Sequence, residues 1–208
     1  MDTYVAFFTL ANLCGFWGLL GSVAWSFART RRGMLTVLML TQPGYVTYWI
    51  LLDHWTAALM TMVGMGLNLL ALGLEGPADS ARVRWTRRAY LVTLLPVFGL
   101  TLGTWEGLPS LLAGTGVAFG CIARWQVKPM RFRLLMSMVN LPWLAHDLLV
   151  GTLPVLASDA FGIGRGIQIA LFANPRTVRI LAFRYARFRR SLRHAALHGL
   201  AGHSAVAS

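Results

Sequence analysis

Long apolar runs separated by short polar stretches dominate this chain. A helix that crosses a bilayer needs about 20 mostly apolar residues, and seven runs come near that length. They cover residues 5–27, 34–52, 56–74, 90–103, 107–123, 134–150 and 152–172. The pattern predicts an all-α, polytopic membrane protein with seven transmembrane helices. The fourth run is short and is interrupted by Pro96, so six spans is the alternative.

Composition favours a chain that lies in lipid over a water-soluble one. Of its 208 residues, 56% are hydrophobic and 12% are charged, whereas soluble domains are about 25% charged. The net charge is nevertheless +12, and 18 of the 19 basic residues are arginines. Such an excess is also typical of nucleic-acid-binding proteins, so the positions of the arginines decide between the two interpretations.

The basic residues lie in the loops after the odd-numbered runs and in the C-terminal tail. The loops after the even-numbered runs carry Asp53 and Glu106 instead. By the positive-inside rule the basic side is cytoplasmic, which puts the N-terminus outside and the C-terminus inside and requires an odd number of spans. We therefore expect the lipid bilayer, and not nucleic acid, to be the main partner. The 18 basic residues of this side are Arg29, Arg31, Arg32, Arg82, Arg84, Arg87, Arg88, Arg124, Lys128, Arg131, Arg133, Arg176, Arg179, Arg184, Arg187, Arg189, Arg190 and Arg193.

Motifs of cofactor, metal or enzyme sites are not found. Cys14 and Cys121 both fall inside apolar runs, and His54 and His146 share no ligand spacing. No serine–histidine–acid set, paired-carboxylate site or HExxH motif stands out. We expect no cofactor, no metal and no enzymatic activity; an intramembrane enzyme that uses His146 and Asp159 is the alternative.

The chain repeats itself weakly at an offset of 98 residues. At this offset Gly18 meets Gly116, Gly64 meets Gly162, and the pair Tyr48-Trp49 meets His146-Asp147. Runs 1–3 then superpose on runs 5–7, as in transporters built from parallel repeats. The pattern predicts a 3+1+3 arrangement. Its parts are a first repeat (1–75), a cytoplasmic loop with a linker helix (76–106), a second repeat (107–173) and a tail (174–208).

A series of residues in the second half resembles the YgjV-like family of bacterial inner-membrane proteins. The resemblance covers roughly residues 5–172 and implies a multi-pass protein of the bacterial inner membrane. That family is distantly similar to the SWEET and PQ-loop transporters, which implies the same 3+1+3 plan and transport of a small solute. The residues that carry the resemblance are Leu108-Pro109, Arg124, Met130-Arg131, Trp143, His146-Asp147, Gly151-Thr152, Asp159 and Gly166.

This sequence also departs from those transporters. The Pro-Gln pair of the PQ-loop proteins is absent, and Gln42-Pro43 has the reverse order. Of the two asparagines that SWEET sugar sites carry, Asn68 is present, but Gly166 stands at its repeat-related position. The resemblance therefore does not imply a sugar pocket.

Polar groups inside the apolar runs are the candidates for solute binding, because a charge at the bilayer centre costs about 2.5–3.5 kcal/mol. We expect a cavity between the repeats lined by Asn68, Trp49, Trp143, His146 and Asp159. The rings would stack on an unknown small polar solute, the polar groups would orient it, and the repeats would rock to alternate access. A tightly packed midplane would count against transport.

Each polar candidate also has a structural interpretation. Asp159 could pair with a cation or a helix end, and His146, one turn after Pro142, could be an interfacial histidine bonded to a neighbour. Asp147 is expected to be solvated near the headgroups. Arg165, six residues after Asp159, cannot pair with it on one helix and is expected to be structural.

Two glycines with GxxxG spacing, Gly162 and Gly166, favour close helix packing, with a hinge as the alternative.

The tail predicts a basic amphipathic helix. Val178, Leu181, Tyr185, Phe188 and Leu192 recur at three- and four-residue spacing, and arginines occupy mainly the other face. Such a helix would lie on anionic lipids of the inner leaflet. The alternative function follows from it: an inner-membrane interaction or assembly protein that transports nothing and docks a partner through its tail. Whether the chain forms a homo-oligomer stays open.

Overall fold

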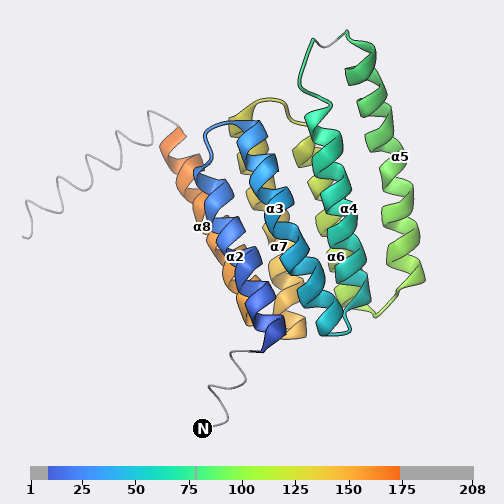
Figure 1. Cartoon of the computed structure of the whole chain (residues 1–208), viewed down its shortest axis with the longest axis vertical. Coiled ribbons are helices and arrows are strands. Elements are labelled where there is room, and N and C mark those ends of the chain that lie inside the picture. Colours follow the sequence, from blue (N-terminus) through green and yellow to red (C-terminus); the bar gives the residue numbers. More distant parts are fainter. Residues whose placement is uncertain (1–8, 78, 174–208) are drawn as a thin grey trace, which may run out of the picture. The chain divides into compact units, whose positions relative to one another are not determined.

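The structure is a computed structural model, and it describes residues 9–77 and 79–173. All regular secondary structure in these residues is α-helical, which confirms the predicted all-α class (Figure 1). The predicted tail helix lies outside the described residues. The seven described helices are α2 (Leu10–Phe27), α3 (Arg31–Leu51), α4 (Trp55–Leu72), α5 (Ala81–Gly103), α6 (Leu108–Arg124), α7 (Pro129–Val150) and α8 (Leu153–Ala173).

Local capping sets several helix ends. The side chains of Thr9, Thr30 and Ser80 accept hydrogen bonds from backbone N–H groups in the first turns of α2, α3 and α5. At the end of α7, Gly151 takes the left-handed conformation with φ 79°, which glycine adopts without a Cβ penalty.

Prolines do not end the helices that contain them. The predicted interruption at Pro96 is wrong, because α5 runs unbroken from Ala81 to Gly103. Likewise α7 continues through Pro142. A proline removes one hydrogen bond, and helices in membranes tolerate this where neighbouring groups satisfy the freed carbonyl.

Three described helices are long and apolar enough to cross a membrane by length and composition: α2, α4 and α8 up to Phe172. The apolar helix α6 is shorter. Large apolar side chains also point outward on other helices, among them Leu40, Leu95, Phe98 and Leu141. A surface with so many exposed apolar side chains is suited to lipid.

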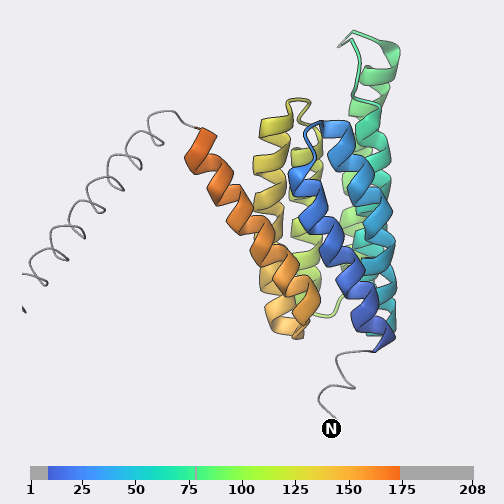
Figure 2. The same cartoon turned by 60° about the vertical axis from the view of Figure 1, so that its left-hand side comes forward.

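Helices up to Gly166 belong to one compact unit, and a second begins at Ile167; the contacts below all lie in the first. Within it α2 packs on α3, α3 on α4, α4 on α6, and α6 on α7 (Figure 2). Helix α5 contacts α4 and α6 and buries one narrow face, including Val83, Tyr90 and Val97. It therefore lies at the edge of the bundle (Figure 1).

Glycines allow the closest helix approaches. A Cβ at Gly18 would overlap the ring of Tyr45, and a Cβ at Gly116 would lie 2.6 Å from Nε1 of Trp143. The two pairs join α2 to α3 and α6 to α7, and the second pair follows the first by 98 residues. The same helix contact is thus built twice along the chain.

Candidate functional site

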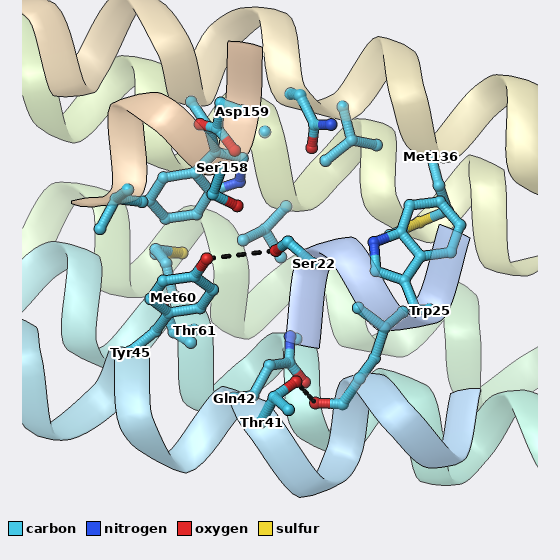
Figure 3. A pocket seen from close by; sticks show the side chains of 18 of the residues that line it. Ser22, Trp25, Thr41, Gln42, Tyr45, Met60, Thr61, Met136, Ser158 and Asp159 are labelled. Atoms are coloured by element: carbon cyan, nitrogen blue, oxygen red, sulfur yellow. Dashed lines mark hydrogen bonds between the residues drawn. The ribbon is translucent and has the colours of Figure 1, made fainter. Parts of the chain in front are cut away.

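A cavity of about 110 Å³ lies inside the bundle (Figure 3). Six described helices contribute to its wall, and α5, the helix at the edge, contributes none of its lining residues. Trp49 of α3 lines the cavity. The lining residues of α2, α4 and α6 are Ser22, Trp25, Met60, Thr61, Gly64, Gly116, Val117 and Arg124. Asp159 and Gln42 lie on opposite sides of the cavity (Figure 3).

Much of the wall is formed by residues that correspond at the 98-residue offset. Four positions of α3 and the four corresponding positions of α7 all line the cavity, as do two of α4 and two of α8. The two halves of the chain therefore present equivalent positions to one space. The corresponding pairs are Leu38 and Met136, Thr41 and Val139, Gln42 and Asn140, Tyr45 and Trp143, Met60 and Ser158, and Thr61 and Asp159.

Three of the five predicted solute ligands line the cavity: Trp49, Trp143 and Asp159. His146 does not; its ring lies behind the wall and packs edge-on against Trp49 and Trp143, with centroid distances of 5.2 Å and 5.5 Å. Asn68 does not line the cavity either. It is fully buried and is hydrogen-bonded to two lining residues, Arg124 and Gln42. The structure thus brings all five into one region, three at the wall and two supporting it.

Asp159 is buried, and its Oδ2 atom has no hydrogen-bond partner in the described part of the chain. Asp147, near the end of α7, is a second buried acid, and its Oδ2 atom likewise has no hydrogen-bond partner among the described residues. The cavity wall and the layer behind it thus contain two buried acidic side chains.

The prediction that Asp147 is solvated is wrong. Its side chain is fully buried, and its Oδ1 atom lies 3.0 Å from Nδ1 of His146. The last turn of α7 faces the start of α8 here, so a position near the end of an apolar run is covered by protein. His146 itself is buried and bonded to this neighbour.

The prediction of Arg124 as a loop residue is also wrong. Arg124 is the last residue of α6, is only 4% exposed, and lines the cavity. Its Nε atom donates a hydrogen bond to Oδ1 of Asn68 at 2.6 Å. Nδ2 of Asn68 in turn donates to Oε1 of Gln42 at 2.7 Å. Sequence reasoning missed Arg124 and Gln42, although each stands at or inside an apolar run.

A second buried arginine, Arg31, joins helix ends. It was predicted as a loop charge, but its side chain is buried and donates to the carbonyls of Ala71, Arg124 and Gln126, each at 2.9 Å. From the other half, Nη2 of Arg133 donates to the carbonyl of Ala28 at 2.5 Å. Arg31 thus connects the start of α3 with the end of α6, and Arg133 connects the first turns of α7 with the end of α2.

The residues predicted to be structural make packing contacts. The guanidinium of Arg165 lies 4.9 Å from the ring centroid of Phe27. Gly162 faces the amide of Asn140, and Gly166 faces Ser137. Helix α8 is continuous through both glycines.

The wall offers hydroxyl, amide, carboxyl and guanidinium groups. On one side, the hydroxyls of Ser22 and Tyr45 are hydrogen-bonded at 3.1 Å (Figure 3). Among the described residues, no group of three or more His, Cys, Asp or Glu side chains could hold a metal ion. These groups can form hydrogen bonds and ionic contacts with a small polar molecule.

The bundle has an apolar outer surface and a central cavity lined by both polar and apolar side chains, which defines the class of a polytopic membrane protein. A family model described as a bacterial inner membrane protein, Imp-YgjV, matches residues 9–172. The chain belongs to this family, and its location is the bacterial inner membrane, as predicted.

One curated relative matches a shorter segment. It is the "Putative manganese efflux pump MntP" of Neisseria meningitidis serogroup C / serotype 2a, 33% identical over 75 residues. The match covers 36% of this chain and 34% of the relative, so the chain spans about a third of that protein's length. No solved structure matches.

Proposed function

We propose that this protein moves a small polar solute across the inner membrane through the central cavity, by alternating access. One observation carries the proposal: inside a membrane protein lies a cavity whose mainly apolar wall contains a buried carboxyl group, Asp159. Buried ionisable groups are costly in membranes and mark solute or proton pathways. The relative's name, an efflux pump, supports transport in general.

The proposed architecture is two parallel three-helix repeats joined by α5, with the N-terminus outside and the C-terminus in the cytoplasm. Support comes from the six pairs of lining residues 98 apart and from the absence of α5 residues in the cavity wall. The sided distribution of arginines supports the orientation. Rocking of one repeat against the other would open the cavity to each side in turn.

The roles of the lining residues follow from their chemistry. Trp49 and Trp143 offer ring faces and edges for stacking, and His146 with Asp147 holds these rings from behind. Asp159 offers a carboxyl group that a solute cation or a proton neutralises. When the charge of the Asp159 carboxyl group is neutralised in this way, no unpaired charge has to stay in the low-dielectric interior while the repeats move.

Manganese is not proposed as the solute. Mn²⁺ is bound by clusters of oxygen ligands, carboxylates foremost, and the wall combines a carboxyl group with the guanidinium of Arg124.

We also propose that the protein has no enzymatic activity. The alternative of a partner-docking assembly protein rests on residues 174–208, which lie outside the described residues.

The test is a flux screen with the full chain in proteoliposomes. We expect at least one small solute to move with wild type, and Asp159→Asn to reduce its flux at least about tenfold, as loss of a functional buried charge implies. Asp53→Asn is the matched control: the substitution is the same, but Asp53 is exposed at the turn between α3 and α4. If no solute moves, or if the two variants behave alike, the transport proposal fails.

A further inference from the structure

We infer that the cavity binds the carboxylate group of its solute between Arg124 and Gln42, in the notch left by Gly64. This inference rests on the proposed function and names the class of solute: a small monocarboxylate, with or without an additional amino group. All three residues line the cavity and come from different helices, α6, α3 and α4.

The first reason is an uncompensated charge. Arg124 is 4% exposed and forms no ion pair within the described chain. Its side-chain hydrogen bond goes to a neutral amide, Asn68. A guanidinium held out of water without a counter-ion is strongly unfavourable. An anion in the adjoining cavity supplies the missing charge.

The second reason is the direction of the hydrogen-bond chain behind the wall. A guanidinium only donates, so Asn68 must present its oxygen to Arg124 and its NH₂ group to Gln42. Gln42 therefore accepts through Oε1, and its own NH₂ group is left as a donor. The groups of this network that border the notch are therefore both donors: the guanidinium of Arg124 and the NH₂ group of Gln42.

The third reason is that these donors converge. A Cβ at Gly64 would lie 3.3 Å from Nε2 of Gln42 and 3.7 Å from Nη2 of Arg124. Both nitrogens thus border the small volume that the glycine leaves free. An acceptor atom of a ligand packed against the backbone of Gly64 would lie close to both nitrogens, and a side chain at position 64 would exclude it.

Charge, geometry and size favour a small monocarboxylate. One guanidinium balances one negative charge, and the planar fork of arginine fits the two oxygens of a carboxylate. A dianion such as a phosphate would carry a second charge into a cavity that also contains Asp159. A neutral polyol would leave Arg124 uncompensated, and about 110 Å³ holds only a small molecule.

The experiment measures ligand-dependent thermal stabilisation of the full chain in detergent. Sodium lactate and L-alanine are the carboxylate probes; glycerol and ethanolamine hydrochloride are the comparison probes at constant chloride. We expect the carboxylates alone to raise the melting temperature. Gly64→Ala should weaken their apparent affinity about tenfold or more, because its methyl group enters the notch without removing a charge.

Gly66→Ala is the matched control. It lies on the same helix, two residues away, and a Cβ there meets nothing within 4 Å. We expect it to bind the carboxylate probes like wild type. Arg124→Gln, provided that it folds, should lose their stabilising effect entirely. The inference is overturned if no carboxylate probe stabilises the wild type, or if Gly64→Ala binds them as Gly66→Ala does.

The outcomes separate this inference from the proposed function. If the flux screen finds a solute that depends on Asp159, but carboxylates neither bind nor move, transport stands and the carboxylate site is wrong. If carboxylates bind in a Gly64-dependent manner but no solute moves, the site stands and transport is wrong.

Discussion

Arg124 and Asn68 lie 56 residues apart in the chain, and Nε of Arg124 donates a hydrogen bond to Oδ1 of Asn68 at 2.6 Å. The bond joins the end of α6 to the C-terminal part of α4, two helices of different proposed repeats that pack together. The bond holds the guanidinium at the cavity wall. Because the oxygen of Asn68 accepts from Arg124, its NH₂ group is the one that donates to Oε1 of Gln42. If the proposed carboxylate site is correct, stability and ligand selection depend on the same pair.

Changing Asn68 should separate these two effects. In Asn68→Asp the new carboxylate would face Arg124 and compensate its charge from behind the wall. We expect the variant to fold and to lose the stabilisation by lactate. Asn68→Leu removes the amide oxygen that accepts from the charged guanidinium, which should cost about 1.5–3 kcal/mol. Thermal unfolding of both variants, with and without lactate, is the measurement. Full lactate binding by Asn68→Asp would contradict the assignment of Arg124.

The two glycine–aromatic contacts should be equally sensitive to an added methyl group. Gly18→Ala would push into Tyr45, and Gly116→Ala into Trp143. Overpacking of this kind costs about 1–3 kcal/mol, so both variants should unfold at a lower temperature than wild type. Gly99→Ala is the control, since a Cβ there has nothing within 4 Å. If only one of the pair is destabilised, the two contacts are not equivalent.

Arg31 should contribute more to stability than its neighbour Arg32. Arg31 donates to three carbonyls at the ends of α4 and α6, whereas Arg32 is exposed. Hydrogen bonds with a charged partner contribute about 1.5–3 kcal/mol each, so Arg31→Met should lower the melting temperature clearly. Arg32→Met should leave it nearly unchanged. Equal effects of the two substitutions would show that the buried bonds contribute little.

The proposed orientation can be tested with single cysteines in a background without Cys14 and Cys121. Asp53→Cys should react with a membrane-impermeant maleimide in intact spheroplasts, because its loop is expected outside. Lys128→Cys, in the basic loop between α6 and α7, should react only after the membrane is opened. The reverse pattern would contradict the positive-inside assignment, and labelling of both in intact cells would contradict an odd number of spans between them.

The apolar runs predicted the seven described helices, because such runs depend on neighbouring residues along the chain. The orientation inferred from the charges stays a prediction. The offset of 98 residues was found from the sequence, but the six pairs at this offset that line the cavity were not predicted. Among these six pairs, only Thr61 and Asp159 combine a hydroxyl with an ionisable group. Gln42 could have been found as well, because its partner at this offset, Asn140, is another amide inside an apolar run.

Burial of individual polar side chains could not be predicted in the same way. Arg124 and Asp147 both stand near the end of an apolar run, where a charge usually reaches water or headgroups. Each is covered instead by a helix distant in sequence: α4 supplies Asn68 to Arg124, and α8 supplies Asp159 beside Asp147. Such contacts depend on tertiary packing, which the local pattern does not contain.

The central claim is that the cavity opens to both sides of the membrane. The direct measurement is the reaction of Ser158→Cys, a residue of the cavity wall, with a small charged methanethiosulfonate added to right-side-out or inside-out vesicles. Ala58→Cys, fully buried outside the cavity wall, is the control. We predict reaction of Ser158→Cys from either side and of Ala58→Cys from neither. Reaction of Ser158→Cys from one side only, or from neither, would contradict alternating access.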